Sequence, residues 1–235
     1  MSDTPLPPTA NPSPTAPPPD QCTPALPPHP DGAWNLILDL ADLTRPLDFP
    51  AIFGRVAPVH IEIGCGSGVF ASRYAQDHPE INLLAMDNQG KQVNRAFDKC
   101  RRRGLTNVRF LRTDAVYVVE EHPADASVDA YHIYYSDPWW KKRHHKRRVW
   151  SPRLLPILRR TLKPGGQLFL KTDVSAYFDV IQELLAGQDF LDLACERRLD
   201  REDPEPADPN YETNYQRKAR LEGHPLHYQR WVRRS

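Results

Sequence analysis

The sequence lacks the features that direct a protein to a membrane or to an oxidising compartment. No apolar run approaches the roughly 18 consecutive residues that a membrane-spanning helix needs, and the first residues do not resemble a secretory signal. The four cysteines are far apart in the sequence, which argues against a disulfide framework and against a structural zinc site. We therefore expect a soluble, cytoplasmic protein that binds neither a membrane nor a metal ion.

The sequence also has little net charge, because 31 lysines and arginines balance 30 aspartates and glutamates. Ten of the basic residues nevertheless lie between residues 139 and 163, a segment without any acidic residue. Such a segment predicts a local anion-binding face, although a run of charge is also typical of a solvated surface.

Proline is concentrated at the start of the chain. Residues 1–30 contain 12 of the 25 prolines and no lysine or arginine. A segment of this composition cannot bury enough apolar surface to offset the entropy of ordering it. We predict a disordered tail over residues 1–30, with a partner-binding polyproline segment as the alternative, and one folded domain over residues 31–235.

The remaining sequence alternates apolar runs of strand length with helical segments. Strands are predicted at Val59–Ile63, Ile81–Met86, Val108–Leu111, Val128–Tyr135 and Gln167–Leu170. Helices are predicted at Val69–Asp77 and Gly90–Arg103, and a third is predicted to start at Ser151-Pro152. This alternation predicts an α/β fold with a mainly parallel sheet and helices on both faces. Leu226–Val232 is predicted to add a final edge strand.

A glycine-rich loop follows the first predicted strand. Its sequence is Glu62-Ile63-Gly64-Cys65-Gly66-Ser67-Gly68. Glycine lets the backbone turn tightly and approach a ligand, and ligands of open α/β sheets bind beyond the carboxyl ends of the strands. Val69 stands where the dinucleotide fingerprint needs glycine, and no P-loop lysine follows. Unless the loop is only a turn, it favours a nucleoside without phosphates.

Three carboxylates are expected around this loop. Asp87 ends the second strand and is placed to accept hydrogen bonds from ribose hydroxyls, or only to cap the following helix. Asp114 follows the third strand and is placed for the amine of an adenine. Glu62 is placed for an ammonium or sulfonium charge. Together they favour a cationic, ribose-containing ligand, and S-adenosylmethionine is such a ligand.

The fourth strand leads into Asp137-Pro138-Trp139-Trp140 and then into the basic segment. The proline biases Asp137 to an extended backbone at the mouth of the expected site. The tryptophans offer flat surfaces for a base, and the cations can neutralise phosphates. The alternative is that one tryptophan belongs to the core. The adjacent His144 and His145 lack a carboxylate or cysteine partner and do not indicate a metal site.

The segment Asp137–Arg148 closely resembles the signature of the tRNA (guanine-N7)-methyltransferases of the bacterial TrmB type. The resemblance runs from about Pro58 to the C-terminus and includes Lys163-Pro164-Gly165-Gly166, Thr172-Asp173 and Gly223-His224-Pro225. It implies a Rossmann-like class I methyltransferase fold with a mainly parallel seven-stranded sheet and an antiparallel C-terminal edge strand. It also implies transfer of a methyl group from S-adenosylmethionine to N7 of a guanosine in the variable loop of tRNA.

The resemblance also implies which residues form the site. The cofactor contacts are Glu62, Gly64, Gly66, Asp87, Asp114 and Asp137. The contacts with the tRNA substrate are Lys141, Asp173, Thr213, Asn214, Tyr215 and Gln216. The basic residues expected to meet tRNA phosphates are Arg143, Lys146, Arg147 and Arg148. The chain departs from the family at Asp87, where glutamate is common, at Ser136, where proline is usual, and at Asn214 and Gln216.

Guanine N7 carries a lone pair and no proton, so the methyl transfer needs no general base. We expect the catalytic Asp137 to orient the guanine and to stabilise its growing positive charge. Asp173 is expected to accept hydrogen bonds from the guanine N1 and amino groups. The competing hypotheses are a methyltransferase that acts on another RNA base or on ribosomal RNA, and an RNA-binding protein without catalysis. The sequence leaves the protein either a monomer or a homodimer.

Overall fold

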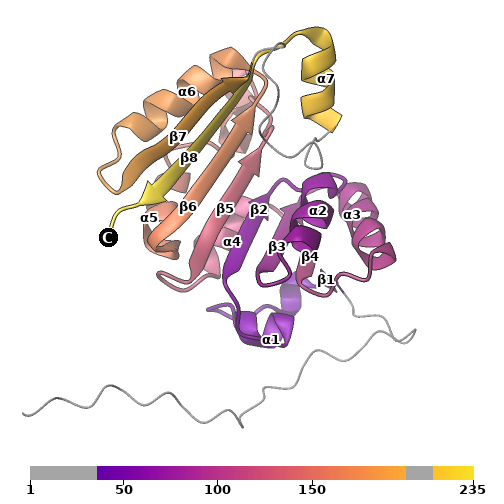
Figure 1. The fold of residues 1–235 in the computed structure, drawn as a ribbon. Coiled ribbons are helices and arrows are strands. Elements are labelled where there is room, and N and C mark those ends of the chain that lie inside the picture. The colour runs from indigo at the N-terminus through magenta and orange to yellow at the C-terminus, as the bar shows by residue number, and fades with distance from the viewer. Residues whose placement is uncertain (1–35, 200–213) are drawn as a thin grey trace, which may run out of the picture.

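The computed structural model describes residues 36–199 and 214–235, and these form one twisted sheet with helices packed against it (Figure 1). The sheet has eight strands in the order β1-β4-β3-β2-β5-β6-β8-β7. Their bounds are β1 Ile37–Leu38, β2 Val59–Ile63, β3 Asn82–Asp87, β4 Val108–Arg112, β5 Val128–Tyr134, β6 Leu162–Thr172, β7 Leu191–Leu199 and β8 Leu226–Arg233. The predicted boundary between a tail and the domain lies outside the described residues.

The predicted mainly parallel α/β sheet is confirmed. Strands β1 to β6 pair in parallel, whereas β8 pairs antiparallel with both β6 and β7. The expected edge position of the C-terminal strand is wrong, because β8 lies between β6 and β7, and β7 forms the edge. The sheet has one strand more than the expected seven. The additional strand is the two-residue β1, which lies at the edge opposite β7.

The helices follow the strands as the alternation predicts. Their bounds are α1 Phe49–Phe53, α2 Val69–Asp77, α3 Gly90–Arg102, α4 Ala115–Glu121, α5 Leu154–Thr161, α6 Ser175–Ala186 and α7 Asn214–Glu222, with short 3-10 turns η1 Leu40–Asp42 and η2 Lys142–Arg147. The predicted start of α5 is wrong, because Ser151 and Pro152 lie in a turn and Arg153 precedes the first helical residue. The Ser151 carbonyl instead accepts a hydrogen bond from the Leu154 amide at 3.0 Å.

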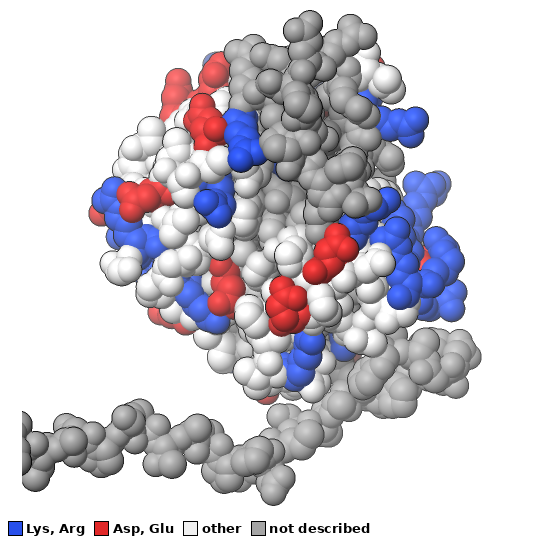
Figure 2. Space-filling view, in the orientation of Figure 1, with Lys and Arg blue, Asp and Glu red and all other residues white. Residues whose placement is uncertain are grey.

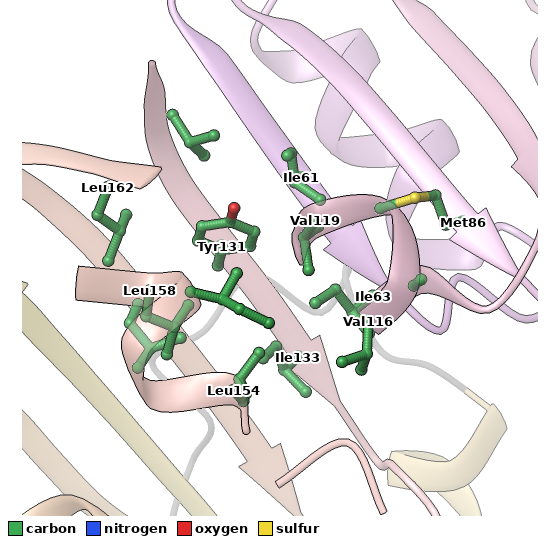
Figure 3. Packing of buried hydrophobic residues seen from close by; sticks show 14 of the residues in the cluster. Ile61, Ile63, Met86, Val116, Val119, Tyr131, Ile133, Leu154, Leu158 and Leu162 are labelled. Carbon is green, nitrogen blue, oxygen red and sulfur yellow. The ribbon is translucent and has the colours of Figure 1, made fainter. Parts of the chain in front are cut away.

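The core consists of two layers, one on each face of the sheet. Along β3, Leu84 and Met86 belong to one hydrophobic cluster, whereas Leu83 and Ala85 belong to the other. This alternation follows from the two-residue period of a strand. Helices α4, α5 and α6 cover the first face, where Tyr131 packs among aliphatic side chains (Figure 3), and α2 and α3 cover the second. All five residues of β3 from Asn82 to Met86 are buried, as expected for a strand covered on both faces.

One glycine of the loop after β2 is required by close packing between helices. Gly68 precedes α2 with φ of +69°, and a Cβ atom there would lie 2.5 Å from Cβ of Ala96 in α3. The absence of a side chain therefore lets the start of α2 touch α3 and fixes the direction in which α2 leaves the loop.

We expect Gly68→Ala to destabilise the fold more than Gly104→Ala. Both glycines have a positive φ, but a Cβ at Gly104 would meet nothing within 4 Å. Gly104→Ala should cost only the roughly 1–2 kcal/mol of left-handed strain, and Gly68→Ala should add about 1–3 kcal/mol of overpacking. Urea unfolding of both variants measures the difference. Equal destabilisation would show that α3 moves away from α2 without cost.

Candidate active site

A cavity of about 770 Å³ lies at the carboxyl ends of β2, β3, β4 and β5. This is the edge of an open α/β sheet where ligands bind. Segments far apart in the sequence meet there. The residues that line it are Glu62–Ser67, Val69, Phe70, Asp87–Gln89, Gln92, Thr113–Val116, Tyr134–Asp137, Trp139, Lys146, Arg147 and Val149.

The glycine loop is tied to the end of the neighbouring strand. The amides of Gly64 and Cys65 both donate to the Met86 carbonyl at 2.9 Å. Gly64 and Gly66 have φ of +84° and +50°, in the left-handed region that glycine adopts without strain. The loop therefore turns sharply away from β2 and presents its backbone to the cavity.

Asp87 is a structural part of this loop as well as a wall of the cavity. Its Oδ2 accepts a hydrogen bond from the Gly66 amide at 2.9 Å, and its Oδ1 accepts one from the Gln89 amide at 2.8 Å just before α3. The alternative that Asp87 only caps α3 is wrong, because Gln89 is the N-cap residue and no side chain caps this helix. A carboxylate has about four acceptor positions, so two such bonds leave capacity for a ligand hydroxyl.

Glu62 is the buried carboxyl group of the cavity. Its side chain comes from β2 and is 3% exposed, and its Oε2 has no hydrogen-bond partner among the described residues. Burial, followed by the nearby charge of Asp87, raises the Glu62 pKa from 4.5 to about 8. A buried, unpaired carboxylate is costly, so a cationic group that enters the cavity would lower the free energy of this site.

Asp114 lines the cavity from the third side. It precedes α4, and its Oδ1 accepts a hydrogen bond from the Val116 amide at 3.0 Å as an N-cap. The residue is exposed, and this one bond leaves its carboxylate with further acceptor capacity for a ligand. The three acids that the sequence analysis selected are thus brought together around one cavity.

The mouth of the cavity is built from a strained turn after β5. Tyr135 and Trp139 have φ of +51° and +43°, a region that non-glycine residues rarely adopt. Between them, Asp137 is exposed and lines the cavity. Residues in such backbone conformations cluster at active sites. Their position on either side of a candidate catalytic carboxylate therefore indicates a functional turn.

The first part of the basic segment follows this turn and forms the 3-10 helix η2, Lys142–Arg147. The Arg147 guanidinium lies 5.0 Å from the centre of the Trp139 ring, and both residues line the cavity. Arg148 is half-buried, donates to the Pro138 carbonyl at 2.6 Å and lies over the rings of Trp140 and Tyr177. The contacts of Arg148 position the turn, whereas Lys146 and Arg147 reach the cavity.

Neither tryptophan of the Asp-Pro-Trp-Trp segment belongs to the core. Trp140 is 53% exposed, and Trp139 is half-buried at the cavity wall. Trp150 and Trp231 are instead buried, with exposed fractions of 2% and 6%. Trp139 is thus at the cavity, where the stacking hypothesis needs it, whereas Trp140 does not line the cavity and contacts Tyr177 and Arg148. Among the described residues, no group of three potential ligands is placed to hold a metal ion.

Three other predicted substrate contacts, Lys141, Arg143 and Asp173, do not line the cavity. Lys141 and Arg143 are exposed at the start of η2, and Asp173 follows the end of β6. Asn214, Tyr215 and Gln216 form the first turn of α7. Thr213 lies outside the described residues, so its role stays a prediction.

Among the cavity residues that the sequence analysis did not select are Gln92 and Tyr134. Gln92 comes from the first turn of α3, and its buried Oε1 has no partner in the described part of the chain. The position of Gln92 on a polar helix gave no signal in the sequence. Its unpaired acceptor is a second atom of the cavity that a ligand donor would satisfy.

Tyr134 is held by a buried chain of hydrogen bonds on the α2 side of the sheet. The Tyr134 hydroxyl contacts His132 Nδ1 at 2.9 Å, His132 Nε2 contacts His60 Nδ1 at 3.1 Å, and His60 Nδ1 contacts the Tyr74 hydroxyl at 3.1 Å. Burial lowers the pKa of His60 to about 4 and that of His132 well below its usual value. Both rings are therefore neutral near pH 7 and support the cavity wall.

Comparison with known proteins places this site in a family. A family model described as "Putative methyltransferase" matches residues 56–228. A tRNA (guanine-N(7)-)-methyltransferase of Cupriavidus necator is 37% identical over 77% of this chain and 68% of its own length. The chain belongs to the tRNA (guanine-N7)-methyltransferase family. The resemblance seen in the Asp137–Arg148 segment is thereby confirmed.

Further relatives carry the same name over shorter matches. Those of Syntrophotalea carbinolica and Paracidovorax citrulli are 44% and 40% identical over 57% and 62% of this chain. The chain spans only 58% and 59% of the length of these two relatives.

Solved structures confirm the fold class. The 16S rRNA methyltransferase KamB superposes with a TM-score of 0.58 at 16% identity, covering 82% of this chain and 96% of that chain. TrmN from Thermus thermophilus superposes with a TM-score of 0.54 at 21% identity, covering 75% of this chain and 44% of that chain. At these identities the likeness concerns the class I methyltransferase fold alone.

The raised pKa of Glu62 predicts a specific pH dependence of stability. In the unfolded chain the Glu62 carboxyl has its usual pKa of 4.5, whereas burial in the fold raises this pKa to about 8. Between these values the folded state binds the extra proton, so its contribution to stability is full below pH 4.5 and is lost as the pH rises through 8.

We expect the stability of the wild type, relative to Glu62→Gln, to fall by a few kcal/mol between pH 5 and about 8.5, since one pKa unit corresponds to about 1.4 kcal/mol. Glutamine keeps the size of the side chain and does not ionise, so it serves as the matched reference. Chemical unfolding of both proteins across this range measures the difference. A difference that stays constant with pH would show that Glu62 ionises normally.

Proposed function

We propose that this protein transfers a methyl group from S-adenosylmethionine to N7 of a guanosine in tRNA. The observation that carries the proposal is the buried, unpaired carboxyl of Glu62 in one cavity with Asp87, Asp114 and Asp137. The cavity thus combines sites for a cationic nucleoside with a carboxylate at the mouth. Membership of the tRNA (guanine-N7)-methyltransferase family supports the choice of base and of RNA.

The residues of the cavity fit S-adenosylmethionine by their chemistry. Glu62, once ionised, would hold the ammonium group, and this pairing would satisfy its orphaned Oε2. The free acceptor capacity of Asp87 would take the ribose hydroxyls, and Asp114 would accept from the adenine amine. The turned backbone at Gly64 and Gly66 leaves room for the ligand beside the loop. When bound, the cofactor supplies an electrophilic methyl group on a positively charged sulfur.

The mouth of the cavity would receive the guanine. Trp139 offers a ring face at the wall, and Asp137 stands beside it. Because N7 has a lone pair and no proton, Asp137 need not remove one. We assign to it the orientation of the guanine and the stabilisation of the positive charge that moves onto the ring. The strained turn at Tyr135 and Trp139 fixes this carboxylate before the substrate arrives.

The remaining contacts would hold the tRNA. Arg143, Lys146, Arg147 and Arg148 would face phosphates, with Arg148 acting mainly through the turn that it supports. Lys141, Asp173 and the segment 213–216 would complete the guanine and tRNA site. We place this activity in the cytoplasm, in keeping with a tRNA substrate. The segment 1–30 is proposed to be dispensable for the reaction.

The proposed function is tested by identifying the modified nucleosides in tRNA that has been incubated with the protein. Purified protein, S-adenosylmethionine and an unmodified tRNA transcript should yield 7-methylguanosine, measured by mass spectrometry after digestion. A transcript with adenosine in place of the variable-loop guanosine is the matched control and should stay unmethylated. Methylation of another base, or methylation of ribosomal RNA alone, would overturn the assignment of N7 of guanosine in tRNA.

Substitution of Asp137 and substitution of the exposed cations beside it should change different kinetic constants. Asp137→Asn keeps the shape of the side chain and removes its charge, so it should mainly lower kcat. Arg143→Ala with Lys146→Ala should mainly raise KM for tRNA and reduce the log–log salt slope by about one to two. Steady-state kinetics at several salt concentrations separate the two effects. A raised KM with unchanged kcat in Asp137→Asn would assign Asp137 to tRNA binding only.

A further inference from the structure

Helix α3 carries an unusual share of the positive charge outside the basic segment. Its 13 residues, Gly90–Arg102, include five lysines and arginines and a single acidic residue, Asp98. Figure 2 shows lysine and arginine side chains gathered on the right-hand side of the molecule, over the position that α3 occupies in Figure 1. Nothing in the proposed chemistry uses these charges.

Three of these cations form a stripe along the helix. Lys91, Arg95 and Arg102 are exposed, and their spacing of four and seven residues places them on one side of the helix. The opposite side of α3 packs on the sheet through Val93 and Ala96. The stripe therefore points to solvent along about 17 Å of helix, at 1.5 Å for each residue.

The stripe is available for an external anion. Lys99, which is not part of it, is occupied by a bond from its Nζ to the Ser67 carbonyl at 2.9 Å. The ion pairs of lysine and arginine side chains between described residues involve other cations. Asp98, which is half-buried on the same side of α3, offsets one of the three charges.

The stripe begins beside the cavity. Gln92, in the same turn as Lys91, lines the cavity. The exposed Arg112 at the end of β4 lies against Gly90, since a Cβ there would lie 3.1 Å from its Cδ atom. Thr113 and Asp114 then continue into the cavity lining. If one base of a polyanion enters the cavity, the backbone next to that base would therefore lie close to these cations.

The topology places the stripe and the basic segment on two sides of the cavity. Helix α3 follows β3, η2 follows β5, and these strands flank β2 on either side. An RNA of many phosphates is much larger than a cavity of about 770 Å³ and needs contacts beyond it. Cations on both sides fix its direction across the site better than cations on one side.

We propose that Lys91, Arg95 and Arg102, continued by Arg112, form a second binding surface for the phosphate backbone of the RNA substrate. This inference rests on the proposed function and names where its substrate lies. The phosphates carry no base information at this surface, so it contributes affinity and orientation rather than the choice of guanine.

The test replaces Lys91, Arg95 and Arg102 together by alanine. Alanine is the best helix former, and none of the three belongs to the cavity lining. The tRNA dissociation constant should rise by roughly tenfold or more, and the log–log salt slope should fall by about three, one for each cation. Cofactor binding and kcat at saturating tRNA should stay within about twofold of the wild type.

A matched control removes the same charge elsewhere. Arg45, Arg159 and Arg234 are exposed, and each pairs with an acidic residue away from α3. Their joint replacement by alanine should leave the salt slope unchanged, because these cations are not expected to contact phosphates. It should also cost little folding stability, because exposed ion pairs contribute little to it. A charge-conserving variant, Lys91→Arg with Arg95→Lys and Arg102→Lys, should retain the wild-type slope.

The outcomes separate this inference from the proposed function. A wild type that makes no 7-methylguanosine in tRNA overturns the function, whatever the stripe does. A wild type that does so, with an alanine variant whose tRNA affinity and salt slope are unchanged, overturns the stripe alone. An equal loss of tRNA affinity in the alanine variant and in the control would show that the effect depends on net charge and not on the stripe. Loss of binding to anionic lipid vesicles, with unchanged tRNA affinity, would assign the stripe to a lipid surface instead.

Discussion

The site depends on the hydrogen bonds that hold the glycine loop to the end of β3. The Met86 carbonyl accepts from Gly64 and Cys65, and the Asp87 carboxylate accepts from Gly66. These bonds join the ends of two parallel strands and set the point at which α2 begins. The close approach of Gly68 to Ala96 then brings α3 beside the loop. One short turn thereby positions Glu62, Asp87 and α3 relative to one another.

The burial of Glu62 is the clearest departure from what folding alone would select. A carboxyl group without a partner in a low-dielectric site favours its protonated form, and the fold retains it although an apolar side chain would cost less. A ligand cation would reverse this preference, because the ionised carboxylate would then be paired. The cost of burying Glu62 and the attraction that it would exert on a positively charged ligand thus have the same physical origin.

The basic residues at the mouth of the cavity differ in what they contact. Arg148 is bound to the Pro138 carbonyl and to aromatic rings, so it supports the strained turn that carries Asp137. Lys146 and Arg147 reach the cavity, whereas the cations of α3 lie on its other side. A run of like charges in the sequence therefore contains residues with different tasks, which only their contacts distinguish.

The sequence by itself determined the parallel α/β fold, the glycine loop and the acids at the strand ends, because strand and helix periodicity and local glycine conformations depend on neighbouring residues. It misplaced β8, since β7 and β8 pair over a long sequence separation that no local pattern records. It also missed Gln92 and Tyr134, whose neighbours come from other strands and helices. Only the tertiary structure decided that Glu62 is unpaired and that α3 adjoins the cavity, because burial and proximity are properties of packing and not of sequence order.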